Sequence, residues 1–218
     1  MANKMRIAVL ASGSGTNLQS ILERQRQGQL DVEIALVISN NPEAKALQRA
    51  AQAGLATRSI NHRNFNSRAE FDQAVVAELT SAEVELVVLA GFMRILSDVF
   101  LRAYPQRIIN IHPALLPAFP GLDAQQQALD YGAKFSGCTV HLVDGGVDTG
   151  PIIVQAAVPI QADDDKDSLA ARIQEQEHRI YPQAIQWFAE GRIKVDGRQV
   201  IIAGADSCPQ VQINPPLD

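Results

Sequence analysis

Asn110 and His112 lie two residues apart at the end of an apolar run, RIINIH at 107–112, which has the character of a buried β-strand. In a strand, residues i and i+2 point to the same face, so this amide and this imidazole are predicted to face one common point. Ile109 and Ile111 then face the other side. An asparagine amide and a protonated histidine both donate hydrogen bonds, and two donors that converge on one point can stabilise an oxyanion.

Asp148 could supply the carboxylate that such an imidazole needs. It lies in DGGVDTG, residues 144–150, a loop followed by a predicted strand. A carboxylate beside a histidine favours the charged imidazole and selects its tautomer. Asp144 precedes a glycine and is most simply a turn residue. His141, on the strand before the loop, either faces the same cavity as His112 or is only a polar strand end.

Zinc binding is the alternative use of His112. The remaining histidines show no metal-ligand spacing with it, and the sequence contains no H-E-x-x-H motif. We therefore predict no metal site. The remaining histidines are His62, His141 and His178.

A glycine-rich turn, ASGSGTNL at 11–18, connects the first predicted strand to the first predicted helix. Free backbone N–H groups and the positive end of a helix dipole suit such a turn to an anion. The turn is not a P-loop, because no Gly-Lys-Ser/Thr ends it. The dinucleotide fingerprint also fails, since Leu18 replaces its third glycine and no carboxylate ends the second strand. The segment is either a tight turn only or, as we favour, the binding loop for the phosphate of a small substrate.

A second segment, AGFMRILS at 90–97, closes a buried strand and opens a helix. Open α/β sheets bind ligands at the C-terminal ends of their strands, where this segment lies. Arg94 is the unusual member, because its neighbours could all be ordinary core residues. Those neighbours are Phe92, Met93, Ile95 and Leu96.

Glu177 falls within the apolar stripe of a long predicted helix at 167–190. Unpaired carboxylates are rarely buried, because removing a charge from water is costly. Glu177 therefore lies at the edge of the stripe or hydrogen-bonds to hydroxyl groups of a substrate.

Alternating strands and helices are predicted through the first two-thirds of the chain. The strands are continuous Val/Ile/Leu runs, which indicates that both of their faces are buried. This repetition predicts an α/β fold, a mostly parallel sheet with helices on both faces. After residue 134, two strands joined by a loop predict an antiparallel extension, and a small hairpin follows. The predicted strands are 6–11, 33–39, 57–60, 85–91, 107–113, 135–143, 151–160, 193–195 and 199–202, and the helices are 17–28, 42–54, 67–80 and 167–190.

The composition is that of an ordinary globular protein. The 218 residues are 46% hydrophobic and 20% charged, with a net charge of −5, which argues against nucleic-acid binding. We predict no signal peptide and no membrane span, because no apolar run approaches ~18 residues. Cys138 and Cys208 form no C-x-x-C pair, which favours a reducing, cytoplasmic compartment. One domain is expected over 1–203, followed by a peripheral tail at 204–218.

Several segments together resemble the phosphoribosylglycinamide formyltransferase family. They are ASGSGTNLQSIL, VVLAGFMRILS, IINIHPALLPAFPG, GCTVHLVDGGVDTGPII and RIQEQEHRIYP, and the resemblance spans about residues 6–190. The resemblance implies a Rossmann-like formyltransferase fold. It also implies transfer of a formyl group from 10-formyltetrahydrofolate to the amine of glycinamide ribonucleotide in purine biosynthesis, without a metal.

The resemblance also implies roles for individual residues. The N-terminal half would bind the substrate phosphate and the C-terminal half the folate, with the loop 144–148 closing over the pteridine. The catalytic residues would be Asn110, His112 and Asp148. The substrate-binding residues would be Gly15, Thr16, Asn17, Gln174 and Glu177. The folate-binding residues would be Arg68, Met93, Arg94, Ile95, Leu96, Asn110 and Asp144.

Two stretches depart from the family pattern. The chain reads GLDAQQQAL after Pro120 where many relatives carry histidines, so Asp123 and Gln126 put any pH response of that loop in doubt. Ala114 stands where serine is usual.

Three other functions compete with this one. A formyltetrahydrofolate deformylase would use similar catalytic residues but usually carries an extra N-terminal domain. A methionyl-tRNA formyltransferase would carry a basic C-terminal domain. A non-catalytic phosphometabolite-binding module would have no need for the three catalytic residues together. We expect small-molecule substrates only, no nucleic acid or membrane partner, and a monomer or homodimer.

Overall fold

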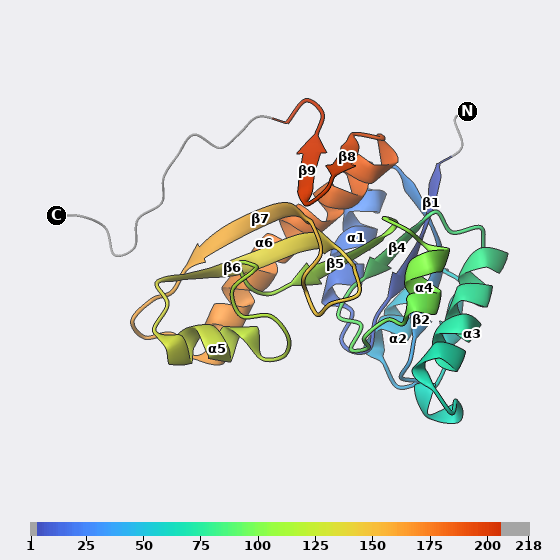
Figure 1. Cartoon of the computed structure of the whole chain (residues 1–218), viewed down its shortest axis with the longest axis horizontal. Coiled ribbons are helices and arrows are strands. Elements are labelled where there is room, and N and C mark those ends of the chain that lie inside the picture. The colour runs from blue at the N-terminus through green and yellow to red at the C-terminus, as the bar shows by residue number, and fades with distance from the viewer. Residues whose placement is uncertain (1–3, 206–218) are drawn as a thin grey trace.

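The structure is a computed structural model that describes residues 4–205. Its centre is a seven-stranded sheet with the strand order β3-β2-β1-β4-β5-β6-β7 (Figure 1). The first five strands in this order are parallel, and β6 and β7 each run antiparallel to the preceding strand. The mostly parallel sheet with an antiparallel extension is therefore confirmed. The strands are β1 (Met5–Leu10), β2 (Val32–Ser39), β3 (Thr57–Ser59), β4 (Leu86–Leu89), β5 (Ile108–His112), β6 (Phe135–Leu142) and β7 (Ile152–Pro159).

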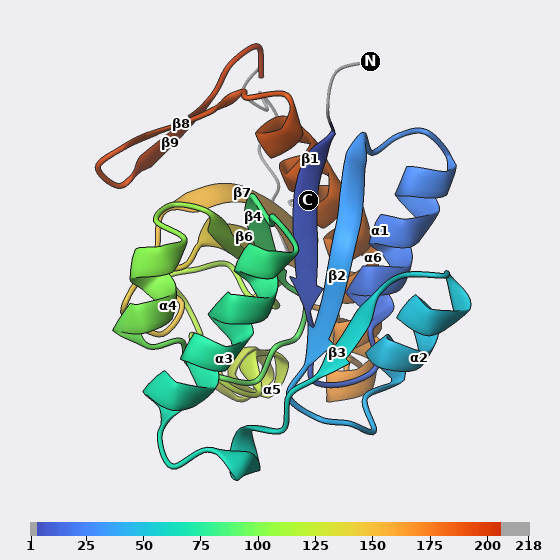
Figure 2. The ribbon, with the colours of Figure 1, turned by 90° about the vertical axis from the view of Figure 1, so that its right-hand side faces the viewer.

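Helices cover both faces of the sheet, as Figure 2 shows for its N-terminal half. One face carries α1 (Thr16–Arg26), α2 (Lys45–Gln52) and α6 (Lys166–Ala189), and the other carries α3 (Arg68–Ser81) and α4 (Asp98–Ala103). The two hydrophobic cores lie between these layers. In β1, Ile7 and Val9 belong to one core and Ala8 and Leu10 to the other, which explains the uninterrupted apolar run.

One helix was not predicted from the sequence. The helix α5 (Ala124–Tyr131) lies in a polar, glutamine-rich segment, and only Ala124 and Ala128 are buried. Two alanines give almost no apolar periodicity, so the usual signal is missing. A 3₁₀ turn, η1 (His62–Asn64), was likewise not predicted.

Beyond α6, the strands β8 (Ile193–Asp196) and β9 (Gln199–Ile202) form a separate antiparallel sheet, as the sequence predicts. Most of the predicted tail at 204–218 lies outside the described residues, as does Cys208. Cys138 is buried in β6, and burial raises the pKa of its thiol to about 12. Within residues 4–205, no helix combines the length and the apolar character that a membrane crossing requires.

Candidate active site

The antiparallel pairing of β5 with β6 assembles the centre of the site. Asn110 pairs with His141, and His112 pairs with Thr139. Paired residues point to the same face of a sheet, so His141 lies beside Asn110. The loop between β6 and β7 then brings Asp148 against the side chains of Asn110, His112 and His141. The backbone φ of Asp148 is positive, at 54°. Of the two alternatives that the sequence left open for His141, the structure shows the first, in which its side chain faces the same cavity as His112.

The Asp148 carboxylate is the central group of this cluster. Its Oδ2 lies 3.3 Å from His112 Nδ1 and accepts a hydrogen bond from the Gly121 N–H at 2.9 Å. Its Oδ1 lies 3.5 Å from His141 Nε2 and accepts from Asn110 Nδ2 at 3.4 Å. The sequence predicted the contact with His112 and the common orientation of Asn110 and His112, and the structure confirms both.

Burial and hydrogen bonding act in opposite directions on Asp148. Burial alone would raise its pKa, but the contacts from His141, Gly121 and His112 outweigh burial and lower the pKa below its usual value. Asp148 is therefore a stable carboxylate at neutral pH, with a side chain that is 13% exposed.

Both ring nitrogens of His112 face oxygen atoms. Nδ1 faces Asp148, and Nε2 lies 2.8 Å from the carbonyl oxygen of Phe119. Burial lowers the pKa of His112 below its usual value, and the Phe119 carbonyl and the Asp148 carboxylate, which raise the pKa, offset burial only in part. Either neutral tautomer leaves one nitrogen lone pair facing an oxygen, and only the charged ring donates to both. The ring is thus arranged to accept a proton when negative charge develops nearby.

His141 holds Asn110 from the other side. Its Nδ1 lies 2.8 Å from the Leu142 carbonyl, which requires a proton on Nδ1. Nε2 lies 3.2 Å from the Asn110 amide nitrogen and 3.5 Å from Asp148 Oδ1, so it accepts from Asn110 in the neutral ring and donates to Asp148 in the charged ring. His141 and Asp148 together orient the Asn110 amide.

The predicted phosphate loop meets the long helix α6. Asn17 Nδ2 donates to Glu177 Oε2 at 2.9 Å, and Gln174 Nε2 donates to Thr16 Oγ1 at 3.1 Å. Glu177 is 8% exposed, and burial raises its pKa. The Asn17 Oδ1 atom is buried and has no hydrogen-bond partner among the described residues. All four side chains predicted to bind the substrate here therefore lie together, with a polar atom still to be satisfied.

Gly15 permits the close approach of this loop to α2. Its φ is +71°, and a Cβ atom there would lie 2.8 Å from Ala46 Cα. A side chain would be strained by the backbone angle and would also contact the backbone of the neighbouring helix.

The segment 91–97 follows β4 and carries most of the predicted folate-binding residues. Met93 and Ile95 are 63% and 54% exposed, although both are large and apolar. Leu96 is buried in the core beneath α3 and α4, so its side chain faces the protein interior. Arg94 is half-buried, and Arg68 is exposed at the first turn of α3.

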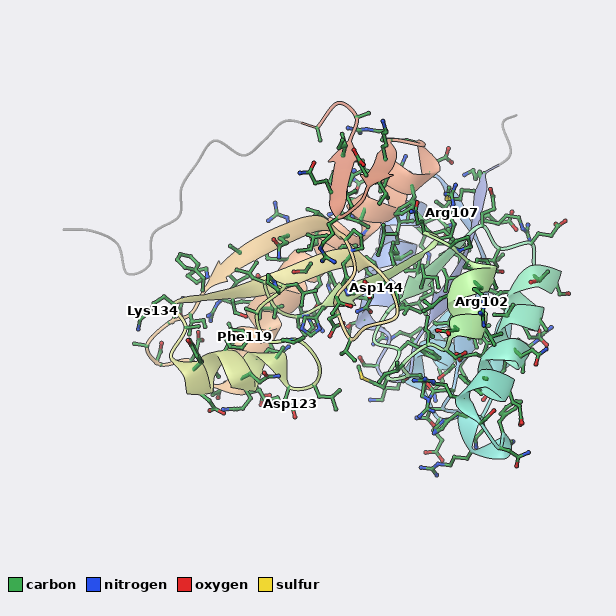
Figure 3. The ribbon with its side chains drawn as sticks, viewed as in Figure 1. Arg102, Arg107, Phe119, Asp123, Lys134 and Asp144 are labelled. Carbon is green, nitrogen blue, oxygen red and sulfur yellow. The ribbon has the colours of Figure 1, made fainter. Side chains whose placement is uncertain are left out.

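Asp144 stabilises its own loop. Its Oδ1 accepts from the Gly146 N–H at 3.1 Å and from Thr149 Oγ1 at 2.5 Å, as expected of a turn residue. Figure 3 shows Asp144 on the loop between β6 and β7, and Phe119 on the segment that leads into α5. Asp123, at the start of α5, pairs with Lys166 at 2.8 Å.

Sequence reasoning missed the backbone groups of Phe119 and Gly121. Main-chain contacts leave no residue-type signal, and these two depend on the path of the segment between β5 and α5. No group of three or more potential metal-ligating side chains occurs among residues 4–205. A cavity of about 910 Å³ lies between α1, α6 and β7, but none of the predicted site residues lines it.

Comparison with known proteins gives concordant matches. The formyl transferase family model matches residues 5–185. The phosphoribosylglycinamide formyltransferase of Escherichia coli is 44% identical over 206 residues, which cover 94% of this chain and 97% of that protein. The trifunctional purine biosynthetic protein adenosine-3 of Drosophila melanogaster is 51% identical over 191 residues, which are 86% of this chain but only 14% of that protein.

A solved structure of glycinamide ribonucleotide transformylase 1 from Symbiobacterium toebii superposes with a TM-score of 0.91 at 51% identity. The match covers 93% of this chain and 95% of the other. The sheet and helices described above are therefore a Rossmann-like formyltransferase fold.

Proposed function

The chain belongs to the formyl transferase family, and on that premise we propose that it transfers a formyl group from 10-formyltetrahydrofolate to the amine of glycinamide ribonucleotide. The products would be N-formylglycinamide ribonucleotide and tetrahydrofolate, in purine biosynthesis. The single observation that carries the proposal is the convergence of Asn110, His112 and Asp148 within hydrogen-bonding and ion-pair distance. A protein that only bound a phosphometabolite would have no need for this arrangement.

The three residues would act on the charge that forms during transfer. When the uncharged amine attacks the formyl carbon, the formyl oxygen becomes an oxyanion. Asn110 Nδ2 and His112 Nε2 would donate to that oxygen, and one such donor is worth roughly 10²- to 10³-fold in rate. Asp148 would keep the imidazole oriented and would favour its charged form as the oxyanion develops. It would also help to move the proton that the amine loses to the departing folate nitrogen.

The proposed reaction requires an exchange of hydrogen bonds. His112 Nε2 faces the Phe119 carbonyl, and Asn110 Nδ2 faces His141 and Asp148. The formyl oxygen would replace Phe119 as the partner of Nε2, which requires movement of the segment before α5. Positive φ values at Phe119 and Asp123 show that this segment is not in a regular conformation.

The two ends of the site suit two different ligands. Thr16, Asn17, Gln174 and Glu177 offer hydroxyl, amide and carboxylate groups to a ribose phosphate, next to the N-terminus of α1. On the other side, Met93 and Ile95 expose apolar surface that fits the flat ring of a folate. The loop 144–148 would close over that ring.

An absorbance assay of tetrahydrofolate release tests the proposal. The protein is mixed with 10-formyltetrahydrofolate, with and without glycinamide ribonucleotide. We expect release only when the amine is present. Release without the amine would instead identify a deformylase, and no release in either mixture would favour a binding module.

The remaining expectations concern partners, compartment and oligomeric state, and they rest on composition. The net charge of −5 disfavours a nucleic-acid partner, and small-molecule substrates account for the polar groups of the site. We propose a cytoplasmic monomer or homodimer. Size-exclusion chromatography with light scattering would distinguish the two oligomeric states.

A further inference from the structure

The segment 92–96 has buried apolar side chains at its two ends and exposed apolar side chains between them. Phe92 and Leu96 are each 7% exposed, whereas Met93 and Ile95 between them are more than half exposed. Phe92 stacks against Phe71 of α3, with ring centroids 6.5 Å apart. The anchored side chains fix the segment against α3, but they do not by themselves fix its backbone.

Ser12 holds the N-terminal end of this segment. Its Oγ accepts a hydrogen bond from the Met93 N–H at 2.8 Å and donates to Asn40 Oδ1 at 2.6 Å. The Ser12 N–H also donates to the Gly91 carbonyl at 3.0 Å. Ser12 belongs to the predicted phosphate loop, three residues before Gly15. Its hydrogen bond with Met93 therefore connects this loop to the segment after β4.

Asp72 holds the C-terminal end. The carboxylate is completely buried on α3, and its Oδ2 accepts a hydrogen bond from the Ser97 N–H at 2.5 Å. Its Oδ1 has no hydrogen-bond partner within the described part of the chain. Burying a carboxylate with so few partners is costly, so an apolar residue here would be expected if packing were the only requirement.

We propose that Asp72 and Ser12 are positioning residues for the formyl donor, an inference that rests on the proposed function. They restrain the segment between them at both ends, so that the side chains of Met93, Arg94 and Ile95 face the donor. Arg68 lies one helical turn before Asp72 on α3, so the same helix presents a donor-binding side chain and holds the segment. Neither Asp72 nor Ser12 needs to touch the reacting atoms.

The test compares Asp72→Ala, Asp72→Asn and Ser12→Ala with the wild-type protein. Steady-state kinetics would give KM for 10-formyltetrahydrofolate, KM for glycinamide ribonucleotide and kcat. Titration with tetrahydrofolate would give a direct dissociation constant. We expect Asp72→Ala and Ser12→Ala to raise the folate constants roughly tenfold, because each loses the acceptor for one backbone N–H. Asp72→Asn keeps an acceptor oxygen and should stay within about threefold of wild type.

Asp98→Ala is the matched control. Asp98 follows the restrained Ser97, but it is exposed and forms no hydrogen bond among the described side chains, so its folate constants should not change. Hydrogen exchange supplies a readout that does not depend on activity. The Ser97 amide should exchange faster in Asp72→Ala than in Asp98→Ala or Asp72→Asn.

Unchanged folate constants in both Asp72→Ala and Ser12→Ala, with an active wild-type protein, would overturn the positioning roles alone. Absence of transfer by the wild-type protein would overturn the proposed function. If Asp72→Ala does not fold, Ser12→Ala decides the question. A folded Ser12→Ala with wild-type folate constants would then refute the inference.

Discussion

At the level of single residues, the site depends on how Asp148 is kept charged inside a largely buried cluster. Removing a carboxylate from water raises its pKa, and hydrogen bonds and positive charge must reverse that effect. The Gly121 N–H and the histidines on either side do so here. Of these partners, the sequence identified only His112.

Asp148→Asn should reduce kcat by roughly 10²- to 10⁴-fold and leave both KM values within a few-fold of wild type. The asparagine keeps the shape of the side chain but cannot stabilise an imidazolium. Because Asp148 raises the pKa of His112, that pKa should fall further in the variant, and the ring should be charged only at lower pH. Steady-state kinetics and an NMR titration of the His112 ring would measure the two effects. A variant with near-wild-type kcat would refute the role.

His141 is predicted to act through Asn110 and Asp148. His141→Leu removes the Nε2 atom near both side chains and should lower kcat by about tenfold, since the Asn110 amide loses one of its two contacts. His141→Gln can still place a polar group near Asn110 and should recover part of the loss. A purely structural role would instead lower the melting temperature of both variants without separating their kcat values.

At the level of elements, a hydrogen-bonded side chain of α6 attaches this helix to the strands β4 and β5 of the sheet. Tyr181 is fully buried in α6, and its hydroxyl donates to the carbonyl oxygens of Leu89 and Ile109, at 2.8 and 3.1 Å. Leu89 ends β4, and Ile109 precedes Asn110 in β5. A single hydroxyl therefore joins the helix that carries Glu177 to the strand that carries Asn110.

Tyr181→Phe should lower the free energy of unfolding by about 1–3 kcal/mol, because two buried carbonyl groups lose a shared donor and no water replaces it. The ring itself still fills its space, so the loss reports the hydroxyl alone. Urea denaturation would measure it. A change below about 0.5 kcal/mol would mean that the carbonyl groups are satisfied in some other way.

A second prediction at this level concerns Gly15, in the turn between β1 and α1. Gly15 and Gly28 share the same left-handed φ of +71°. A Cβ atom added at Gly15 would lie against Ala46 of α2, whereas a Cβ atom added at Gly28 would meet no described atom within 4 Å. Gly28→Ala should cost about 1–2 kcal/mol from backbone strain alone. Gly15→Ala should cost more and should also weaken binding of glycinamide ribonucleotide. Equal losses of stability in the two variants would show that α2 moves away without cost.

At the level of the whole molecule, the sheet brings together groups that are distant along the chain. Asn17 and Glu177 are 160 positions apart, and Asn110 and Asp148 are 38 apart. The parallel half of the sheet places the loops after β1, β4 and β5 at one edge. The strand β6 runs away from that edge and ends beside the start of β5, and the loop after β6 folds back to place Asp148 against Asn110 and His112. Contacts of this kind form only when the complete sheet is in place.

Stability should depend on pH through Asp164, which precedes α6. Arg172 donates hydrogen bonds to its carboxylate and holds its pKa well below the usual value of about 3.9. The resulting stabilisation is complete above the unfolded pKa and is lost as pH falls toward the folded pKa. Asp164→Asn should therefore lower the free energy of unfolding by about 1–2 kcal/mol at pH 7. The difference should shrink below about pH 4.

Denaturation of wild type and variant at pH 7 and pH 3 would measure this effect. Asp163→Asn is the control, because Asp163 is exposed and should change stability by less than about 0.5 kcal/mol at either pH. A difference that is the same at both pH values would exclude the charge of Asp164 as its cause.

The sequence by itself determined the features that depend on local periodicity. Apolar runs buried on both faces predict the parallel sheet, and the spacing of two between Asn110 and His112 places them on one face, because a strand alternates its side chains. The turn at Gly15 could also be predicted locally, from the glycine-rich segment 11–18 between the first strand and the first helix. Family resemblance added expected roles for individual residues, and those roles remain predictions.

Only the tertiary structure decided which groups complete the site. His141 and Asp148 reach Asn110 through the register of β5 with β6 and through a loop that holds Asp148 at a positive φ. The Phe119 carbonyl and the Gly121 N–H contribute through the backbone, which carries no residue-specific signal. Each of these contacts depends on distances between segments far apart in the chain, and such distances are set by the packing of the whole sheet.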